Sequence, residues 1–142
     1  MKPPLDEVRA WLLKAGGDLL SARILVGHSP LVLGPAAFHC QQAVEKALKA
    51  FLVWRSTPFE RVHSLVYLMD LCEAQEPGFA ALREEAETLS PYAIEVRYPG
   101  EAPEISPEDG RKALAAAEAV WGFVLGLLPR ELQISIPQGD SE

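Results

Sequence analysis

Residues 34–55 read Gly-Pro-Ala-Ala-Phe-His-Cys-Gln-Gln-Ala-Val-Glu-Lys-Ala-Leu-Lys-Ala-Phe-Leu-Val-Trp-Arg, and this stretch decides the fold. Pro35 suits the first turn of a helix, where its missing N–H costs nothing. Apolar side chains then recur at helical spacing, at Ala37, Cys40, Val44, Ala47, Leu48 and Phe51. A second face holds small residues that let another helix approach closely, namely Cys40, Ala43, Ala47 and Ala50. This pattern predicts the central helix of a bundle.

The third side of this helix is polar. Its side chains fall on one stripe, which consists of Gln41, Gln42, Glu45, Lys46 and Lys49. Glu45 lies four residues before Lys49, and Gln42 lies four before Lys46, so both pairs can meet along the helix edge. The stripe is either a plain solvated edge or a functional site.

Length and composition predict one soluble cytoplasmic domain. The 142 residues are 49% hydrophobic and 23% charged, which is ordinary for a globular protein with a real core. We expect no signal peptide, and the most apolar run, residues 119–128, is about half the length of a membrane-spanning helix. Cys40 and Cys72 each lie in an apolar helical stripe, so we expect buried thiols and no disulfide.

Charge is distributed unevenly along the chain. The net charge is −7, which argues against general nucleic-acid binding. Residues 1–69 contain eight Lys/Arg and five Asp/Glu, whereas residues 70–109 contain two and eleven. The basic first half therefore permits a local anion site within an acidic protein, although the acids can also serve only to keep the surface soluble.

The first helix is predicted from about Pro4 to Val26. Its apolar repeat consists of Val8, Trp11, Ala15, Leu19, Ala22 and Val26. Gly16 and Gly17 interrupt it, but the repeat keeps its phase across them, which favours one helix. Asp18 then lies beside the apolar stripe, where an unpaired carboxylate would be costly. Its carboxylate either meets solvent or a backbone donor, or pairs with a cation across the bundle or with a ligand.

Three further helices follow the central one. The third begins either at the capping-box sequence of residues 57–60 or nearer to His63 and Ser64. The fourth turns its apolar side chains inward, namely Phe79, Leu82, Ala86 and Leu89, and a short extra helix through Tyr92 is predicted after it. The last begins at Ser106 and Pro107, which combine a cap with a first-turn proline.

The second half of the last helix is apolar all round, from Trp121 to Leu128. Such a helix needs cover on two sides, and a homodimer contact would supply the second cover. Residues 129–142 have no helical repeat and are predicted to be a loose tail. The fold is thus predicted to be all-α, an antiparallel four-helix up-and-down bundle with one short extra helix, in a domain of residues 1–128.

No metal or cofactor motif is present in the sequence, because His28, His39 and His63 are scattered, and His39 is interpreted as a surface residue. The polar side chains that could face one groove are Asp18, Gln41, Gln42, Glu45, Lys46, Lys49, His63, Arg97 and Tyr98. Lys46 and Lys49 could neutralise phosphates, which indicates a nucleotide or other anionic ligand. Arg97 could bind one phosphate bidentately, and Tyr98 could stack on a base.

Four blocks in order resemble the HEPN domain family over roughly residues 5–128. They are Asp18-Leu-Leu-Ser-Ala22, Phe38-His-Cys-Gln-Gln-Ala-Val-Glu-Lys-Ala-Leu-Lys-Ala50, His63-Ser-Leu-Val-Tyr-Leu68, and Tyr92 followed by Arg97-Tyr98-Pro99. The resemblance implies a helical bundle similar to the substrate-binding part of some aminoglycoside nucleotidyltransferases, usually dimeric. It also implies a non-catalytic module that binds a nucleotide or other substrate and acts with a small nucleotidyltransferase.

Many HEPN proteins are ribonucleases or toxins of toxin–antitoxin pairs, with an Arg-x4–6-His motif near the start of the last long helix. Here no histidine follows Arg97, and the spacing occurs only at Arg23 and His28, at the end of the first helix. Two alternatives to the binding module therefore stay open. One is a metal-independent ribonuclease that uses His63 and Arg97, and the other is a purely structural interaction domain.

Overall fold

The computed structural model describes residues 2–94 and 104–138, and its regular structure there is entirely helical. Three helices are long, α1 (Leu5–Val26), α2 (Leu33–Trp54) and α5 (Pro107–Leu127), and two are shorter, α3 (Leu65–Gln75) and α4 (Arg83–Leu89). Short 3₁₀ helices are η1 (Pro30–Val32), η2 (Pro77–Leu82), η3 (Ser90–Tyr92) and η4 (Arg130–Leu132). The predicted all-α bundle is confirmed.

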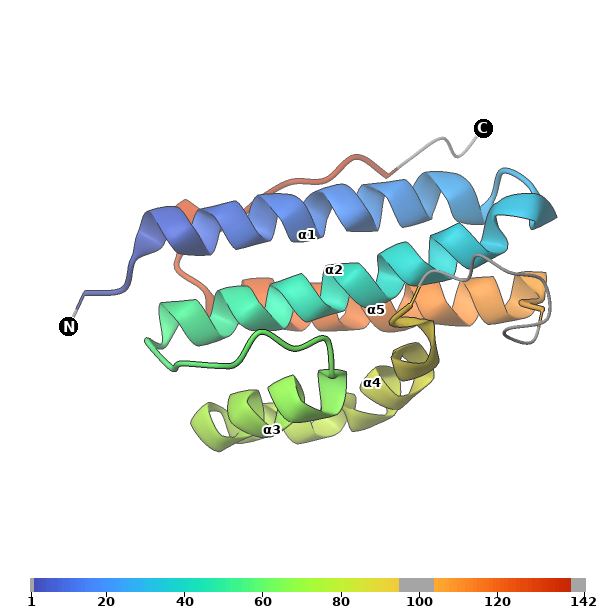
Figure 1. Ribbon diagram of the computed structural model, residues 1–142. Helices are drawn as coiled ribbons and strands as arrows, with labels where there is room; N and C mark the ends of the chain where they lie inside the picture. The colour runs from blue at the N-terminus through green and yellow to red at the C-terminus, as the bar shows by residue number, and fades with distance from the viewer. Residues whose placement is uncertain (1, 95–103, 139–142) are drawn as a thin grey trace.

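The helix α2 lies at the centre of the bundle. It runs antiparallel to α1, with α5 behind it and the α3–α4 pair below (Figure 1). Its small-residue face is fully enclosed, as Cys40, Ala43, Ala47 and Ala50 are all buried. Small side chains on this face let the neighbouring helices approach closely, as the sequence predicts.

The third helix begins at Leu65, the later of the two predicted starts. Ser64 caps it, because the Ser64 hydroxyl accepts a hydrogen bond from the Tyr67 amide at 3.2 Å. Residues 57–60 are not helical, and the Glu60 amide donates instead to the Tyr67 hydroxyl at 3.0 Å. An irregular loop therefore connects α2 to α3, and His63 lies just before the N-cap of α3.

The predicted fourth helix is divided into η2 and the seven-residue helix α4. Phe79 in η2 is fully buried, and its ring centroid lies 4.9 Å from both Phe51 of α2 and Phe123 of α5. This aromatic contact positions α4 against the long helices. The start of α5 is as predicted, with a reciprocal capping box between Ser106 and Asp109.

Gly16 and Gly17 lie inside one continuous helix, as the phase of the apolar repeat predicts. A methyl group on Gly16 would lie 3.3 Å from Ile136 Cδ1 and 3.6 Å from Trp121 Cη2, whereas one on Gly17 would meet open space. Gly16 thus permits close packing of the C-terminal segment and of α5, and this packing offsets its cost to the helix.

Residues 129–138 are packed against the bundle, which corrects the prediction of a loose tail. The Arg23 guanidinium donates to the carbonyls of Ile136 at 3.1 Å and Pro137 at 2.7 Å, and Leu132 is buried. The Gln133 side-chain amide donates to the carbonyls of Leu125 at 2.6 Å and Leu128 at 3.1 Å, at the C-terminal end of α5. Alternating isoleucines, Ile134 and Ile136, pack on the core here, a two-residue pattern that a search for helical repeats overlooks.

The apolar second half of α5 is covered largely within the chain. Trp121 and Val124 are buried, Phe123 stacks on Phe79, and Leu128 is buried at the turn into the C-terminal segment. Contacts within the chain thus supply part of the cover for α5, while Phe123, Leu125 and Leu127 are only partly buried. A homodimer therefore remains a prediction that rests on the family resemblance.

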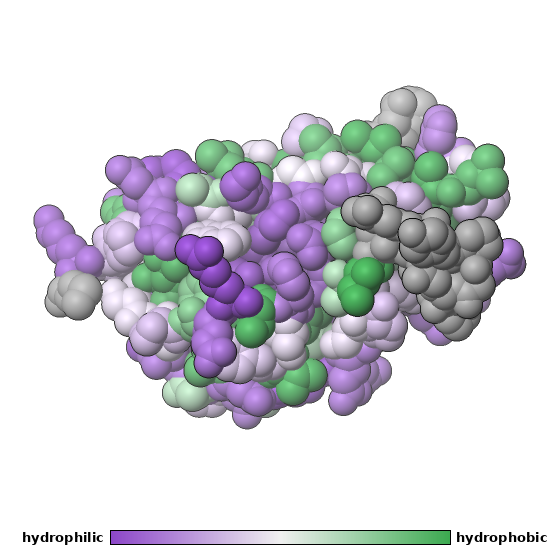
Figure 2. All heavy atoms as spheres, in the orientation of Figure 1, coloured by the Kyte–Doolittle hydropathy of each residue, from purple (hydrophilic) through white to green (hydrophobic). Residues whose placement is uncertain are grey.

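The surface in Figure 2 shows two regions of different character. Polar side chains gather along the line where α1 and α2 meet. Apolar side chains gather over the end of α1 and the turn after it, where Ile24 and Leu31 are exposed. In the part of the chain that the structure describes, no helix is both long enough and apolar enough to cross a membrane.

Both cysteines are buried and free. Burial, with a smaller contribution from the charge of Glu118, raises the pKa of the Cys40 thiol to about 12. Burial also raises the pKa of Cys72. Neither thiol is therefore expected to ionise or to react at neutral pH.

Two glycines of α5 allow a matched test of its packing. A methyl group on Gly110 would lie 2.8 Å from Leu33 Cδ2 and 3.1 Å from Val26 Cγ2, whereas one on Gly122 would meet nothing within 4 Å. Gly122→Ala is expected to stabilise the protein by up to about 1 kcal/mol through helix propensity. Gly110→Ala is expected to be less stable than Gly122→Ala by about 1–3 kcal/mol, because the added methyl overpacks the site. Urea denaturation measures both, and equal stabilisation would contradict the close approach of α5 to the α1–α2 turn.

Candidate functional site

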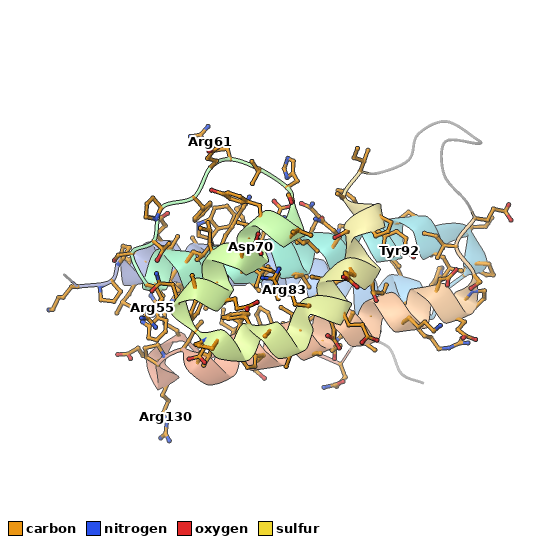
Figure 3. The ribbon with its side chains drawn as sticks, turned by 90° about the horizontal axis from the view of Figure 1, so that it is seen from below. Arg55, Arg61, Asp70, Arg83, Tyr92 and Arg130 are labelled. Carbon is orange, nitrogen blue, oxygen red and sulfur yellow. The ribbon has the colours of Figure 1, made fainter. Side chains whose placement is uncertain are left out.

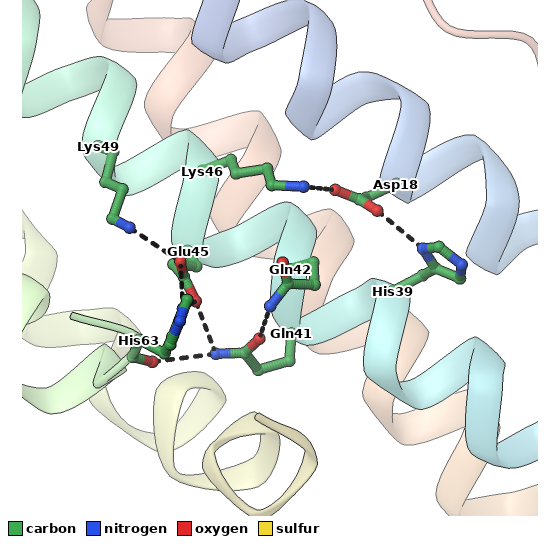
Figure 4. Close-up of polar contacts among 8 residues, drawn as sticks. All are labelled: Asp18, His39, Gln41, Gln42, Glu45, Lys46, Lys49 and His63. Atoms are coloured by element: carbon green, nitrogen blue, oxygen red, sulfur yellow. Dashed lines mark hydrogen bonds and ion pairs between the residues drawn. The ribbon is translucent and has the colours of Figure 1, made fainter. Parts of the chain in front are cut away.

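The carboxylate of Glu45 is the centre of a buried polar network on α2 (Figure 4). Lys49 Nζ lies 2.9 Å from Glu45 Oε2, and the two side chains are only 7% and 3% exposed. His63 Nδ1 lies 3.0 Å from the same oxygen, and Gln41 Nε2 lies 3.4 Å from Oε1. The predicted pairing of Glu45 with Lys49 is thus confirmed, but the pair is buried rather than solvated.

Two aromatic rings enclose the Lys49 ammonium group. Its Nζ lies 5.4 Å from the centroid of Trp11, on α1, and 5.9 Å from that of Phe59, in the loop before α3. These distances suit cation–π attraction. The two rings also pack edge to face, with centroids 6.4 Å apart. The ammonium is therefore held from several sides by groups that are distant in sequence.

Gln41 extends the network in two directions. Its Nε2 donates to the carbonyl of His63 at 3.2 Å, which ties the loop before α3 to α2. Its Oε1 accepts from Gln42 Nε2 at 2.8 Å. Gln42 does not form the predicted contact with Lys46, because Lys46 pairs with the carboxylate of Asp18, a stronger acceptor for an ammonium group.

Asp18 connects α1 to α2 through two contacts. Its Oδ2 lies 2.6 Å from Lys46 Nζ, and its Oδ1 lies 2.7 Å from His39 Nδ1. Of the two interpretations of Asp18, the structure confirms a cation across the bundle. The sequence predicts that His39 is a plain surface histidine, but its side chain is half-buried and contacts Asp18. Its spacing of seven residues from Lys46 places both on one face of α2, and this was the signal that could have identified it.

These residues form two neighbouring hydrogen-bonded groups along α2, which we together call the polar strip: Asp18, His39 and Lys46 in one, and Gln41, Gln42, Glu45, Lys49 and His63 in the other (Figure 4). It contains two carboxylates and two ammonium groups, and each lysine has a carboxylate within 3 Å. With neutral imidazoles the strip has no net charge. Both lysines that the sequence predicts as phosphate ligands are thus paired with carboxylates within the protein.

His63 connects the polar strip to a cleft. Its side chain is 73% exposed although its Nδ1 contacts the buried Glu45. The cleft has a volume of about 400 Å³ and is lined by His63, Ser64, Leu65, Val66, Ser90, Ala93 and Ile94. It lies between the start of α3 and the chain after α4. Glu45 accepts from the Nδ1–H of His63, which leaves Nε2 as the free ring nitrogen.

An ion-pair cluster joins α3 and α4. Arg83 of α4 lies 2.7 Å from Asp70 and 2.8 Å from Glu73, both on α3, and Figure 3 shows Arg83 directed toward Asp70. Hydrogen bonds to these carboxylates raise the pKa of Arg83. In the same view Arg61 points away from the bundle, so this loop arginine does not belong to the strip.

Two predicted site residues, Arg97 and Tyr98, lie outside the described residues 2–94 and 104–138. Their roles therefore remain predictions. The Arg-x4–6-His spacing of Arg23 and His28 has a structural explanation instead. Arg23 bonds to Glu118 at 2.8 Å and to the C-terminal segment, whereas His28 is exposed after the end of α1.

The described residues contain no group of three or more His, Cys, Asp or Glu side chains placed to hold a metal ion. The polar strip is thus organised by ion pairs and amide hydrogen bonds. Its chemistry is that of a hydrogen-bonding surface with one exposed imidazole beside an apolar cleft.

These features define a class of protein, namely an all-α bundle with a polar strip along its central helix. The HEPN domain model matches residues 8–128, and the chain belongs to the HEPN domain family. The fold is also similar to the crystal structure of an archaeal HEPN homologue, with a TM-score of 0.66 and 24% sequence identity, covering 89% of this chain and 98% of that one. No curated protein matches the chain.

Proposed function

We propose that this HEPN protein is a non-catalytic binding module that holds a nucleotide or similar small ligand and acts with a small nucleotidyltransferase. The observation that carries the proposal is the buried Glu45–Lys49 pair that positions His63 at the cleft. The partner follows from the family resemblance, as does the homodimer. Co-purification with a co-expressed nucleotidyltransferase, and light scattering for the mass in solution, test these two assembly states.

The cost of the network supports a functional role. Taking two charges out of water costs several kcal/mol, and apolar residues of similar volume often stabilise a core equally well. In this helix Gln41, Glu45 and Lys49 are buried as deeply as the apolar residues beside them. A network that is costly and that holds an exposed imidazole in place is typical of a binding or reaction site.

Calorimetry with ATP, GTP and short RNAs tests ligand binding. His63→Ala is expected to weaken binding of the preferred nucleotide at least about tenfold, which corresponds to about 1.4 kcal/mol. Arg61→Ala, on the same loop but directed away from the bundle, is the matched control and is expected to bind within about twofold of wild type. Arg97→Ala, which removes a predicted phosphate contact, is expected to weaken binding less than His63→Ala does. No measurable heat with any of these ligands would remove the proposed function.

One observation favours ribonuclease activity as a second candidate. The Glu45 carboxylate holds Nδ1 of an exposed His63, an arrangement that suits a general base. Incubation of the purified protein with end-labelled RNA tests this candidate directly. Cleavage that His63→Ala abolishes would favour it, whereas cleavage that persists in that variant, or no cleavage, excludes His63 as the base.

A further inference from the structure

Among residues 2–94 and 104–138, the side chains that line the cleft include no Lys, Arg, Asp or Glu. Its walls are apolar at Leu65, Val66 and Ile94, and its polar groups are those of His63 and two serines. Ser64 Oγ accepts from the Tyr67 amide and can still donate, whereas Ser90 Oγ donates to the Ala86 carbonyl and can still accept. The cleft therefore presents hydrogen-bonding groups against an apolar wall.

The two lysines of the polar strip are neutralised within the protein. Lys49 Nζ is 2.9 Å from Glu45, and Lys46 Nζ is 2.6 Å from Asp18. A phosphate could reach Lys49 only by displacing Glu45 and the rings of Trp11 and Phe59 around the ammonium. The start of α3 contributes the equivalent of about half a positive charge, which is small against the three to four negative charges of a triphosphate.

We propose that the cleft binds the uncharged nucleoside part of the ligand, with the base between the apolar walls and its polar edge on His63 Nε2 and the serine hydroxyls. This inference rests on the proposed function and specifies which half of a nucleotide this site recognises. The volume of about 400 Å³ falls in the range typical of small-ligand sites. The phosphates extend from the cleft and contribute little to its affinity.

Titration with adenosine, guanosine, cytidine, uridine and inorganic tripolyphosphate separates the two halves. At pH 8, where imidazole is ordinarily neutral, one nucleoside is expected to bind within about tenfold of its triphosphate. Raising the salt concentration from 50 to 500 mM is expected to change its affinity less than about twofold, because an uncharged ligand is not screened. Tripolyphosphate is expected not to compete.

A matched pair of variants ties this binding to the cleft. Ile94→Asp introduces a charge into the lining at a side chain that is 78% exposed, and Leu31→Asp introduces one at a side chain outside the lining that is 91% exposed. Because both positions are exposed, both variants are expected to fold. Ile94→Asp is expected to lower nucleoside affinity at least about tenfold, whereas Leu31→Asp leaves it unchanged.

The outcomes distinguish this inference from the proposed function. If nucleotides bind, tripolyphosphate competes with them and nucleosides do not bind, the inference is wrong and the proposed function stands. If nucleosides bind equally well to both aspartate variants, the cleft is not their site and the inference is overturned. If no nucleotide, nucleoside or RNA binds, both are overturned.

Discussion

Replacing Lys49 by alanine is expected to lower the free energy of unfolding by about 3–5 kcal/mol at neutral pH. The change leaves the Glu45 carboxylate, whose side chain is 3% exposed, without its ammonium partner at 2.9 Å. It also removes the cation between Trp11 and Phe59. Urea denaturation followed by circular dichroism measures the loss.

Two controls separate the unpaired charge from the loss of side-chain volume. The double variant Glu45→Gln with Lys49→Met removes both charges and is expected to lose much less stability than Lys49→Ala. Lys112→Ala breaks an exposed pair, with Nζ 3.6 Å from Glu108, and is expected to change stability by less than about 1 kcal/mol. A Lys49→Ala effect as small as that of Lys112→Ala would contradict the burial of the network.

Phe79→Ala is expected to cost about 3–5 kcal/mol, because a fully buried aromatic ring is removed from a packed core. The ring contacts Phe51 and Phe123 at centroid distances of 4.9 Å and so joins η2 to α2 and α5. Loss of the ring leaves a cavity at this junction. Thermal and urea denaturation measure the expected decrease.

The variant Phe79→Leu serves as the reference for this measurement. It keeps most of the apolar volume but loses the edge-to-face aromatic contacts, which are worth about 0.5–1.5 kcal/mol each. Its loss is therefore expected to fall clearly below that of Phe79→Ala. Equal losses from the two variants would mean that the aromatic geometry, rather than the filled volume, holds η2 in place.

Much of the fold can be predicted from local patterns along the chain. The repeat across Gly16 and Gly17 predicts one continuous α1, and Ser106 with Pro107 predicts the start of α5, because capping and helical periodicity involve residues close in sequence. The start of α3 is less certain, because two caps compete. The structure uses the later cap, Ser64, and the Glu60 amide donates to the Tyr67 hydroxyl.

The C-terminal segment shows where such patterns fail. Ile134 and Ile136 alternate along the chain and pack against the core, and Ile136 lies beside Gly16, a residue more than 100 positions earlier in the sequence. A local sequence repeat carries no information about contacts between residues that are so far apart in the chain. The same segment, together with Phe79, covers part of the apolar half of α5, for which the helix pattern alone predicts a second copy.

The candidate site, like the fold, can be predicted only in part from the sequence. The sequence predicts that Gln41, Glu45 and Lys49 share one stripe of α2, because residues three and four apart lie on one helix face. It predicts neither that the stripe is buried nor that His39 belongs to it. Burial depends on Trp11 and Phe59, and His39 depends on Asp18, all contributed by other elements.

Helix type, helix order and the shared stripe of Gln41, Glu45 and Lys49 on α2 thus follow from the chain alone, since each reflects short-range periodicity. The depth of Glu45 and Lys49, the pairing of each lysine with a carboxylate and the neutral cleft beside His63 arise only when the helices pack. The physical reason is that burial and charge neutralisation depend on the groups that surround a side chain, and in this bundle many of those groups come from distant parts of the chain.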